Sequence, residues 1–68
     1  MNNKILALVM VDTYDNEESF LQFYVNTDHI VAIFEDYKDE NRCYISLTNG
    51  KHYNIDLSIS DLRSMLNQ

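Results

Sequence analysis

Two histidines and one cysteine are the side chains of this sequence best suited to bind a transition metal. A zinc site would need them together, because zinc takes nitrogen and sulfur ligands in a tetrahedral arrangement. Cys43 falls on the inward side of an alternating strand, whereas His52 falls on the outward side of the next one. His29 precedes a different strand. We therefore expect no zinc site.

Carboxylates could bind calcium instead, and Asp12, Asp15 and Glu17 are the best-spaced group. Their spacing differs from that of the EF-hand loop, and the segment lacks the glycine which that loop needs for its sharp turn. A solvated loop explains these residues better. We predict no metal and no cofactor.

Nucleophilic catalysis requires a serine or cysteine beside a histidine that a carboxylate orients. Cys43 alternates with two apolar residues and is therefore expected in the core. Ser58 has a structural role at the start of a helix, and the single glycine, Gly50, lies in a hairpin rather than a phosphate-binding loop. We predict that the protein is not an enzyme.

Hydrophobic periodicity divides the chain into five strands and one helix. The predicted strands are residues 5–11, 19–26, 29–36, 42–48 and 52–57, and the predicted helix is residues 60–67. Residues 12–18 and 37–41 are predicted as acidic loops, and residues 26–28 as a polar turn, because Asn and Asp bond readily to their own backbone.

Two connections carry specific signatures. Asn49 and Gly50 supply the positive φ angles that a two-residue type I′ hairpin requires. Ser58 and Asp61 have the spacing of a helix capping box. Behind this cap an apolar stripe at helical spacing must dock on the sheet, since two helical turns are not stable alone; it consists of Ile59, Leu62, Met65 and Leu66.

These elements predict a single domain, residues 1–68, of the mostly β (α+β) class. We expect a five-stranded antiparallel meander, strongly curved or closed into a small SH3-like barrel, with a short C-terminal helix. In a meander, alternate loops share one end of the sheet, so the two acidic loops would lie together. The resulting acidic pole would consist of Asp12, Asp15, Glu17, Glu18, Glu35, Asp36, Asp39 and Glu40.

Eleven acids against five bases give the chain a formal net charge of -6. This charge argues against direct binding of nucleic acid or of an anionic membrane, because both need clustered Lys or Arg. It suits a protein partner with a basic surface. The leading hypothesis is a non-catalytic adaptor or inhibitor, of the kind that bacteriophages and mobile elements carry. The alternative is that the acidity only keeps a small protein in solution.

The first three predicted strands are apolar on both faces, and a two-turn helix covers one side of a small sheet at most. The residues expected on the second face are Leu6, Leu8, Met10, Phe20, Tyr24, Phe34 and Tyr44. Because large exposed apolar patches are rare on monomers, we expect a homo-oligomer, dimer or higher. A second functional hypothesis is that this aromatic face forms a pocket that sequesters a nucleotide-like ligand.

A reducing compartment, the cytoplasm, is expected because a single cysteine cannot form an internal disulfide. Lys4 and the apolar residues 5–11 resemble the start of a signal peptide, but the apolar run is short and no cleavage site follows. No segment has the roughly 20 apolar residues of a membrane span.

Residues 26–35, N-T-D-H-I-V-A-I-F-E, and residues 45–62, I-S-L-T-N-G-K-H-Y-N-I-D-L-S-I-S-D-L, resemble the small flagellar FlbD-like proteins. That family has a polar turn, an isoleucine-rich strand, an L-T-N-G-K hairpin, another strand and a short acidic helix. The resemblance covers about residues 26–66, and its most specific piece is residues 47–51. It implies a non-enzymatic, oligomeric β protein, with a flagellar-type regulatory role as a third hypothesis. The acidic loop 12–18 departs from the family's tight first turn.

Overall fold

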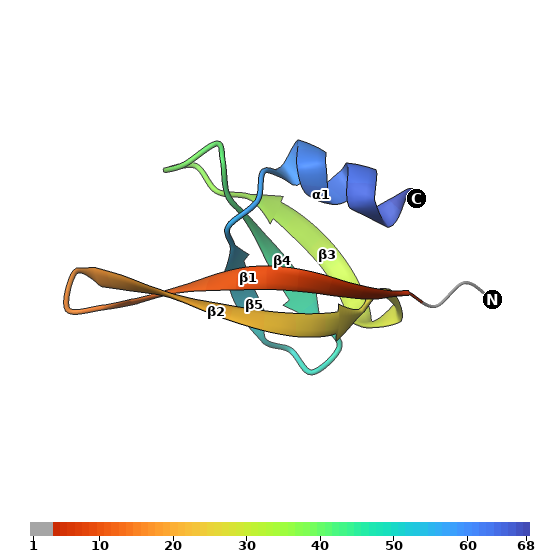
Figure 1. Cartoon of the computed structure of the whole chain (residues 1–68), viewed down its shortest axis with the longest axis horizontal. Helices are drawn as coiled ribbons and strands as arrows, with labels where there is room; N and C mark the ends of the chain where they lie inside the picture. The colour runs from red at the N-terminus through yellow and green to blue at the C-terminus, as the bar shows by residue number, and fades with distance from the viewer. Residues whose placement is uncertain (1–3) are drawn as a thin grey trace.

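The computed structural model describes residues 4–68 and contains a five-stranded antiparallel sheet with a short C-terminal helix (Figure 1). The strands are β1 (Ile5–Tyr14), β2 (Glu17–Asn26), β3 (Ile30–Glu35), β4 (Cys43–Leu47) and β5 (His52–Ile55), followed by the helix α1 (Ile59–Leu66). A 3-10 turn, η1 (Thr27–His29), joins β2 to β3. The predicted mostly β class with its terminal helix is confirmed.

The sheet is open, with strand order β2-β1-β5-β4-β3. The expected meander fails at one place, because β2 and β3 do not pair and β1 pairs with β5 instead. This pairing joins only Met10 to Ile55 and Val11 to Asn54, and the β1–β2 ribbon then crosses in front of the other strands (Figure 1). The barrel expectation was wrong for the same reason: β2 and β3 remain two separate edges.

The predicted acidic loop at residues 12–18 is instead the tip of a long hairpin. β1 and β2 pair without a break, from Ile5 opposite Asn26 to Tyr14 opposite Glu17. Only Asp15 and Asn16 therefore form the turn. Both have positive φ, 53° and 65°, as a type I′ turn requires. Both faces of the two strands are exposed here, so the sequence is polar on both faces and has no hydrophobic alternation that would predict a strand.

The Asn49-Gly50 hairpin exists, but its turn is not the predicted type I′. Among residues 4–68, Gly50 is the only residue of this connection with positive φ, at 84°. The amide of Gly50 donates to the carbonyl of Leu47 (2.9 Å), and the amide of Leu47 donates to the carbonyl of Lys51 (3.0 Å). This is a three-residue connection that ends in a left-handed glycine, the next most common hairpin class.

The core lies between the sheet and α1. Its buried members are Leu6, Leu8, Val25, Cys43, Ile45, Ile55 and Leu62. The Oγ of Ser58 accepts from the amide of Asp61 (3.1 Å), and Leu62 is fully buried, so the predicted helix start and apolar stripe are confirmed.

The outer face of β1 was assigned to the wrong residues. Leu6 and Leu8 are 8% and 2% exposed, and Met10 packs against the core, so none of the three belongs to a surface left over. On the opposite face of β1, Ile5 is 61% exposed and Ala7 is exposed, whereas Val11 is 8% exposed. The sequence showed that β1 has two apolar faces but not which of them the helix side would cover.

Candidate functional site

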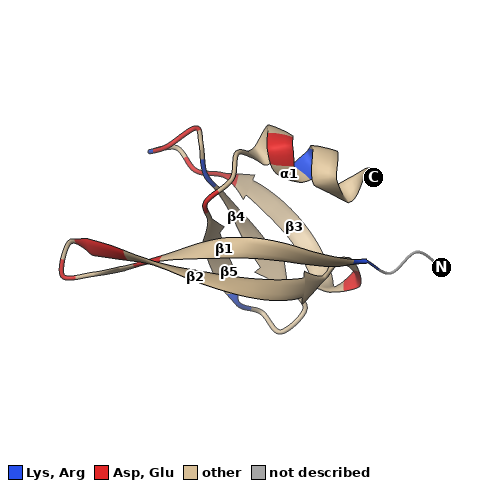
Figure 2. Cartoon of the chain, viewed as in Figure 1, with Lys and Arg blue, Asp and Glu red and all other residues tan. Residues whose placement is uncertain are grey.

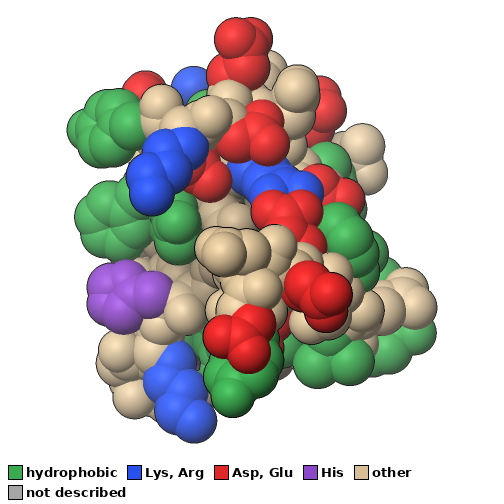
Figure 3. Space-filling view, turned by 90° about the vertical axis from the view of Figure 1, so that its left-hand side faces the viewer, with side chains coloured by type: hydrophobic (Ala, Val, Ile, Leu, Met, Phe, Trp, Pro, Cys, Tyr) green, Lys and Arg blue, Asp and Glu red, His purple; other side chains and the backbone are tan. Residues whose placement is uncertain are grey.

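Two acidic segments that are distant in sequence lie toward the same end of the molecule, on the left in Figure 2. One is the tip of the β1–β2 hairpin, and the other is the connection between β3 and β4 with the end of β3. We call this region the acidic end; it comprises Asp12, Asp15, Glu17, Glu18, Glu35, Asp36, Asp39, Glu40 and, from the end of β5, Asp56. Figure 3 looks onto this end and shows acidic side chains over its upper and central parts.

Arg42 ties the two segments together. Its Nη1 and Nη2 donate to the two carboxylate oxygens of Glu18, at 2.7 and 3.1 Å, in the bidentate geometry that arginine favours. Its Nε donates to Asp56 Oδ1 (3.3 Å) and lies 3.6 Å from Asp39 Oδ2. The guanidinium also lies 5.8 Å from the ring centre of Phe20 on β2. One side chain thus holds β2, the β3–β4 connection and the end of β5 together.

These contacts shift the titration of both partners. The hydrogen bond from Arg42 lowers the pKa of Glu18 below its ordinary value of 4.5, and this effect outweighs the opposing effect of burial. The same hydrogen bond raises the pKa of Arg42 above its ordinary value. Both groups are therefore charged at neutral pH. Away from this network, burial raises the pKa of the Cys43 thiol, with a smaller contribution from Asp36, which suits an unreactive core cysteine.

Two of the predicted carboxylates shape the β3–β4 connection itself. Asp36 Oδ1 accepts from the amide of Lys38, and Asp39 Oδ1 accepts from the amide of Asn41, each at 2.9 Å. Asp36 Oδ2 also accepts from the side chain of Asn54 (3.2 Å). These are local Asx turns, and they fix the loop in place of regular structure.

The other five predicted carboxylates have exposed side chains. Within residues 4–68 they take part in no hydrogen bond or ion pair, and they are Asp12, Asp15, Glu17, Glu35 and Glu40. The acidic end holds nine acids and two bases, Lys38 and Arg42, which gives -7. The remainder holds two acids and three bases, which gives +1, and the two parts sum to the chain's -6. The charge is therefore strongly segregated.

Sequence reasoning missed two residues of this site, Arg42 and Asp56. Both were assigned only to strands. The pairing of Arg42 with Glu18 spans 24 residues, and no local pattern indicates it. The one signal in the sequence is that Arg42 is the only arginine among the acidic segments, so that several carboxylates compete for it.

The aromatic residues predicted on the second face do lie outward, but they do not form one pocket. Phe20, Phe34 and Tyr44 fall in a single cross-strand row, which runs through Val11 and Asn54 in the order of the sheet. Two strands therefore separate Phe20 from the Phe34–Tyr44 pair, or about 14 Å at the usual strand spacing. Tyr24 lies further along β2 and is 69% exposed.

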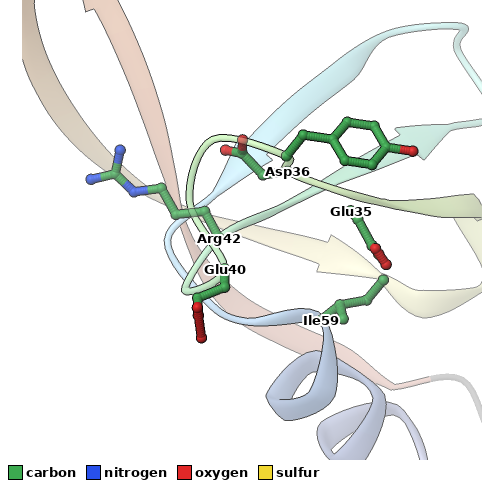
Figure 4. Close-up of a pocket in the computed structure, with 6 residues that line it drawn as sticks. Glu35, Asp36, Glu40, Arg42 and Ile59 are labelled. Carbon is green, nitrogen blue, oxygen red and sulfur yellow. The ribbon is translucent and has the colours of Figure 1, made fainter.

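A cavity of about 260 Å³ opens between the β3–β4 connection and the start of α1 (Figure 4). Glu35, Asp36, Tyr37, Glu40, Arg42 and Ile59 line it. Figure 4 shows the carboxylate of Glu35 turned toward Ile59, while the guanidinium of Arg42 points away. None of the four outward aromatics named above lines this cavity. Its charged rim is dominated by carboxylates.

Within residues 4–68, no three His, Cys, Asp or Glu side chains are grouped in a way that could hold a metal ion. Over the same residues, no helix has the length and apolar character needed to cross a membrane.

No protein-family model, no curated protein and no solved structure matches this chain. The resemblance to the flagellar FlbD-like proteins stays a prediction.

Proposed function

We propose that the protein is a non-catalytic binding protein whose acidic end engages a basic surface of a protein partner, as an adaptor or an inhibitor. The observation that carries this proposal is the segregation of charge: -7 at one end against +1 in the remainder. A field of one sign over one end attracts and orients a basic partner, with an effect that falls as salt rises.

The acidic end is suited to recognition because its carboxylates divide into two groups. Glu18, Asp36 and Asp39 are held by contacts within the chain, and they make the end rigid. The five exposed carboxylates described above are available to a partner. A rigid frame lowers the ordering cost of binding, since fewer side chains must be fixed when the complex forms.

A nucleotide-like ligand is the alternative that the geometry favours least. The 260 Å³ cavity presents Glu35 and Glu40, whose charges repel phosphate. The row of outward aromatics offers stacking surfaces but is interrupted between Phe20 and Tyr44.

The test compares three double variants that change the net charge of the protein by the same amount but at different places. Asp15→Asn/Glu17→Gln and Glu35→Gln/Glu40→Gln each change the formal net charge from -6 to -4 at the acidic end. The matched control, Asp28→Asn/Asp61→Asn, makes the same change elsewhere. A partner purified with the wild-type protein is then titrated with each pair. If two exposed ion pairs are lost, binding should weaken roughly 5- to 30-fold for the acidic-end pairs.

The control pair should bind as the wild type does, and wild-type binding should weaken with added salt. Equal losses for all three pairs, or binding that is insensitive to salt, would contradict the proposal.

A further inference from the structure

β2 and β3 are the two edges of the sheet, and among residues 4–68 only the β2 edge lacks protection against pairing with another strand. β3 is irregular, because its register against β4 shifts between Ile30 and Ala32, and α1 packs beside it. Bulges and covering elements are the usual means by which sheet edges are blunted. β2 runs ten residues in continuous register, and its residues 19–25 include no charge and no proline.

The hydrogen-bonding groups that β2 leaves unpaired follow from its turn. In a two-residue hairpin, the residues that flank the turn, Tyr14 and Glu17, form a hydrogen-bonded pair. Bonded and non-bonded pairs alternate from there. The N–H and C=O groups that point away from β1 therefore belong to Glu18, Phe20, Gln22, Tyr24 and Asn26.

We propose that a second copy of this chain pairs with β2 through this edge, antiparallel, with the twofold axis at Gln22. In this register Gln22 lies opposite itself, and Phe20 lies opposite Tyr24 of the second copy. Both rings are on the outward face, 55% and 69% exposed in the single chain. Such cross-strand aromatic pairs stabilise antiparallel sheets. On the other face, Leu21, 59% exposed, meets Phe23 of the second copy, which lies at the rim of the core.

Charge selects this register over its neighbours. A shift of two residues in one direction places Glu18 opposite Tyr24 of the second copy, and a shift in the other direction places it opposite Asp28. In the proposed register Glu18 lies opposite Asn26, an amide that can donate to it. Only this arrangement avoids both a carboxylate against an aromatic ring and a pair of like charges.

The same geometry keeps the two acidic ends apart. Because the strands are antiparallel, the hairpin tips point in opposite directions, with Glu17 of each copy opposite Thr27 of the other. The two Glu17 residues are then about 34 Å apart along the strand, several Debye lengths at physiological salt. Two copies of charge -6 can therefore associate without bringing their acidic ends together.

The interface is small, which sets the concentration range of the test. The exposed parts of the two aromatic rings contribute about 500 Å² over both copies, if each ring has roughly 200 Å² of surface. This area and one strand edge per copy correspond to a weak dimer. Sedimentation velocity from about 10 µM to about 1 mM should show wild-type mass rising from the 8.0 kDa of one chain toward twice that value.

The position of the axis is tested at Gln22, which is exposed and whose substitution leaves the monomer's core untouched. Gln22→Lys and Gln22→Glu each place like charges opposite one another and should weaken dimerisation about 5-fold. An equimolar mixture of the two variants should restore it, because Lys then faces Glu. Rescue by mixing is expected only if residue 22 faces residue 22.

The aromatic contacts are tested by Phe20→Ser/Tyr24→Ser, which removes both ring pairs and should weaken dimerisation about 100-fold. The matched control is Tyr14→Ser/Tyr37→Ser, at side chains 80% and 97% exposed, and it should dimerise as the wild type does. Circular dichroism spectra show whether each variant is folded.

Disulfide trapping gives an independent measurement. Gln22→Cys should cross-link in an oxidising buffer, because paired Cα atoms about 5.5 Å apart are within disulfide reach. Val31→Cys on β3, 64% exposed, should not.

Three results would each overturn the proposal. They are a wild-type mass that stays at one chain over the whole concentration range, dimerisation that survives loss of both ring pairs, and failure of the Lys–Glu mixture to recover dimerisation. Its test uses no partner, so it stands or fails separately from the proposed function.

Discussion

The hairpins β1–β2 and β4–β5 have the same topology but different surroundings. β4–β5 is short, and Cys43, Ile45 and Ile55 in it are completely buried. The outer half of β1–β2 is the reverse, since residues 12–22 are exposed without interruption. The turns differ as well: Asp15 and Asn16 make the tight two-residue turn, whereas the Asn-Gly sequence makes the longer one.

The difference teaches that the place of a hairpin in the sheet, and not its turn sequence, decides whether it forms part of the core or a surface for contacts. β4–β5 lies at the centre of the sheet, where β5 pairs with β1 and β4 pairs with β3. The outer half of β1–β2 extends beyond the core, so it contributes little burial and instead displays carboxylates and a strand edge. The acidic end and the free edge of β2 each include residues of this extended half.

The largest expected effect is on the free energy of unfolding, and it distinguishes the two hairpins by the burial of their side chains. Ile45→Ala, at a side chain 0% exposed, should lower the free energy of unfolding by about 2–5 kcal/mol through lost transfer energy and a cavity. The matched change Ile5→Ala on β1, at a side chain 61% exposed, should alter it by about 0.5 kcal/mol or less. Urea unfolding followed by circular dichroism measures both. If Ile45→Ala does not fold, Ile45→Val should still lose about 0.5–1.5 kcal/mol. Equal losses for Ile45→Ala and Ile5→Ala would mean that β4–β5 is not the more buried hairpin.

A smaller effect distinguishes the two turns. Gly50→Ala should lower the free energy of unfolding by about 1 kcal/mol, because φ of 84° is unfavourable for a residue with a Cβ. Apart from Gly50 and its two chain neighbours, no atom of residues 4–68 lies within 4 Å of the added Cβ, so the loss is conformational. Asn16→Gly in the β1–β2 turn should be close to neutral, since glycine also adopts its φ of 65° readily. Thermal unfolding of the two variants checks this, and a neutral Gly50→Ala would show that the connection rearranges.

The smallest effect is a pH dependence at the contact between the extended hairpin and the rest. The pKa of Glu18 is lower in the folded protein than its ordinary value of 4.5, so its contribution to stability is present above pH 4.5 and is lost as pH falls below it. Melting temperatures of wild type and Glu18→Gln should therefore differ modestly at pH 7 and converge at lower pH. Glu40→Gln, at a carboxylate outside the network, is the control. A difference that stays constant across this range would mean that the Arg42–Glu18 pair does not form in solution.

Local signals in the sequence were sufficient for most of the secondary structure. Alternation located β4 and β5, and Ser58 with Asp61 located the start of α1, because each depends on neighbouring residues only. Alternation failed at the tip of β1–β2, where both faces are solvated and no hydrophobic period exists to detect. It also failed to choose the buried face of β1, since Leu6 and Leu8 alternate with residues that are equally apolar.

For the candidate site as well, the sequence predicts one part and leaves the other undetermined. The acidic residues could be named from the sequence, since composition shows them directly. Their arrangement could not, because Arg42 reaches Glu18 only after β5 has paired with β1, and it reaches Asp56 through the register of β4 with β5, in which Cys43 lies opposite Ile55.

By itself, the sequence determined a mostly β chain with an acidic surplus, a capped terminal helix and no local catalytic pattern, since propensity, capping and charge are local properties. The tertiary structure decided the pairing of β1 with β5, and with it which strands remain edges and that Glu18 reaches Arg42. That pairing joins residues more than forty positions apart. The pairing depends on which arrangement of all the strands and the helix buries apolar surface most favourably, and no local stretch of sequence contains that information.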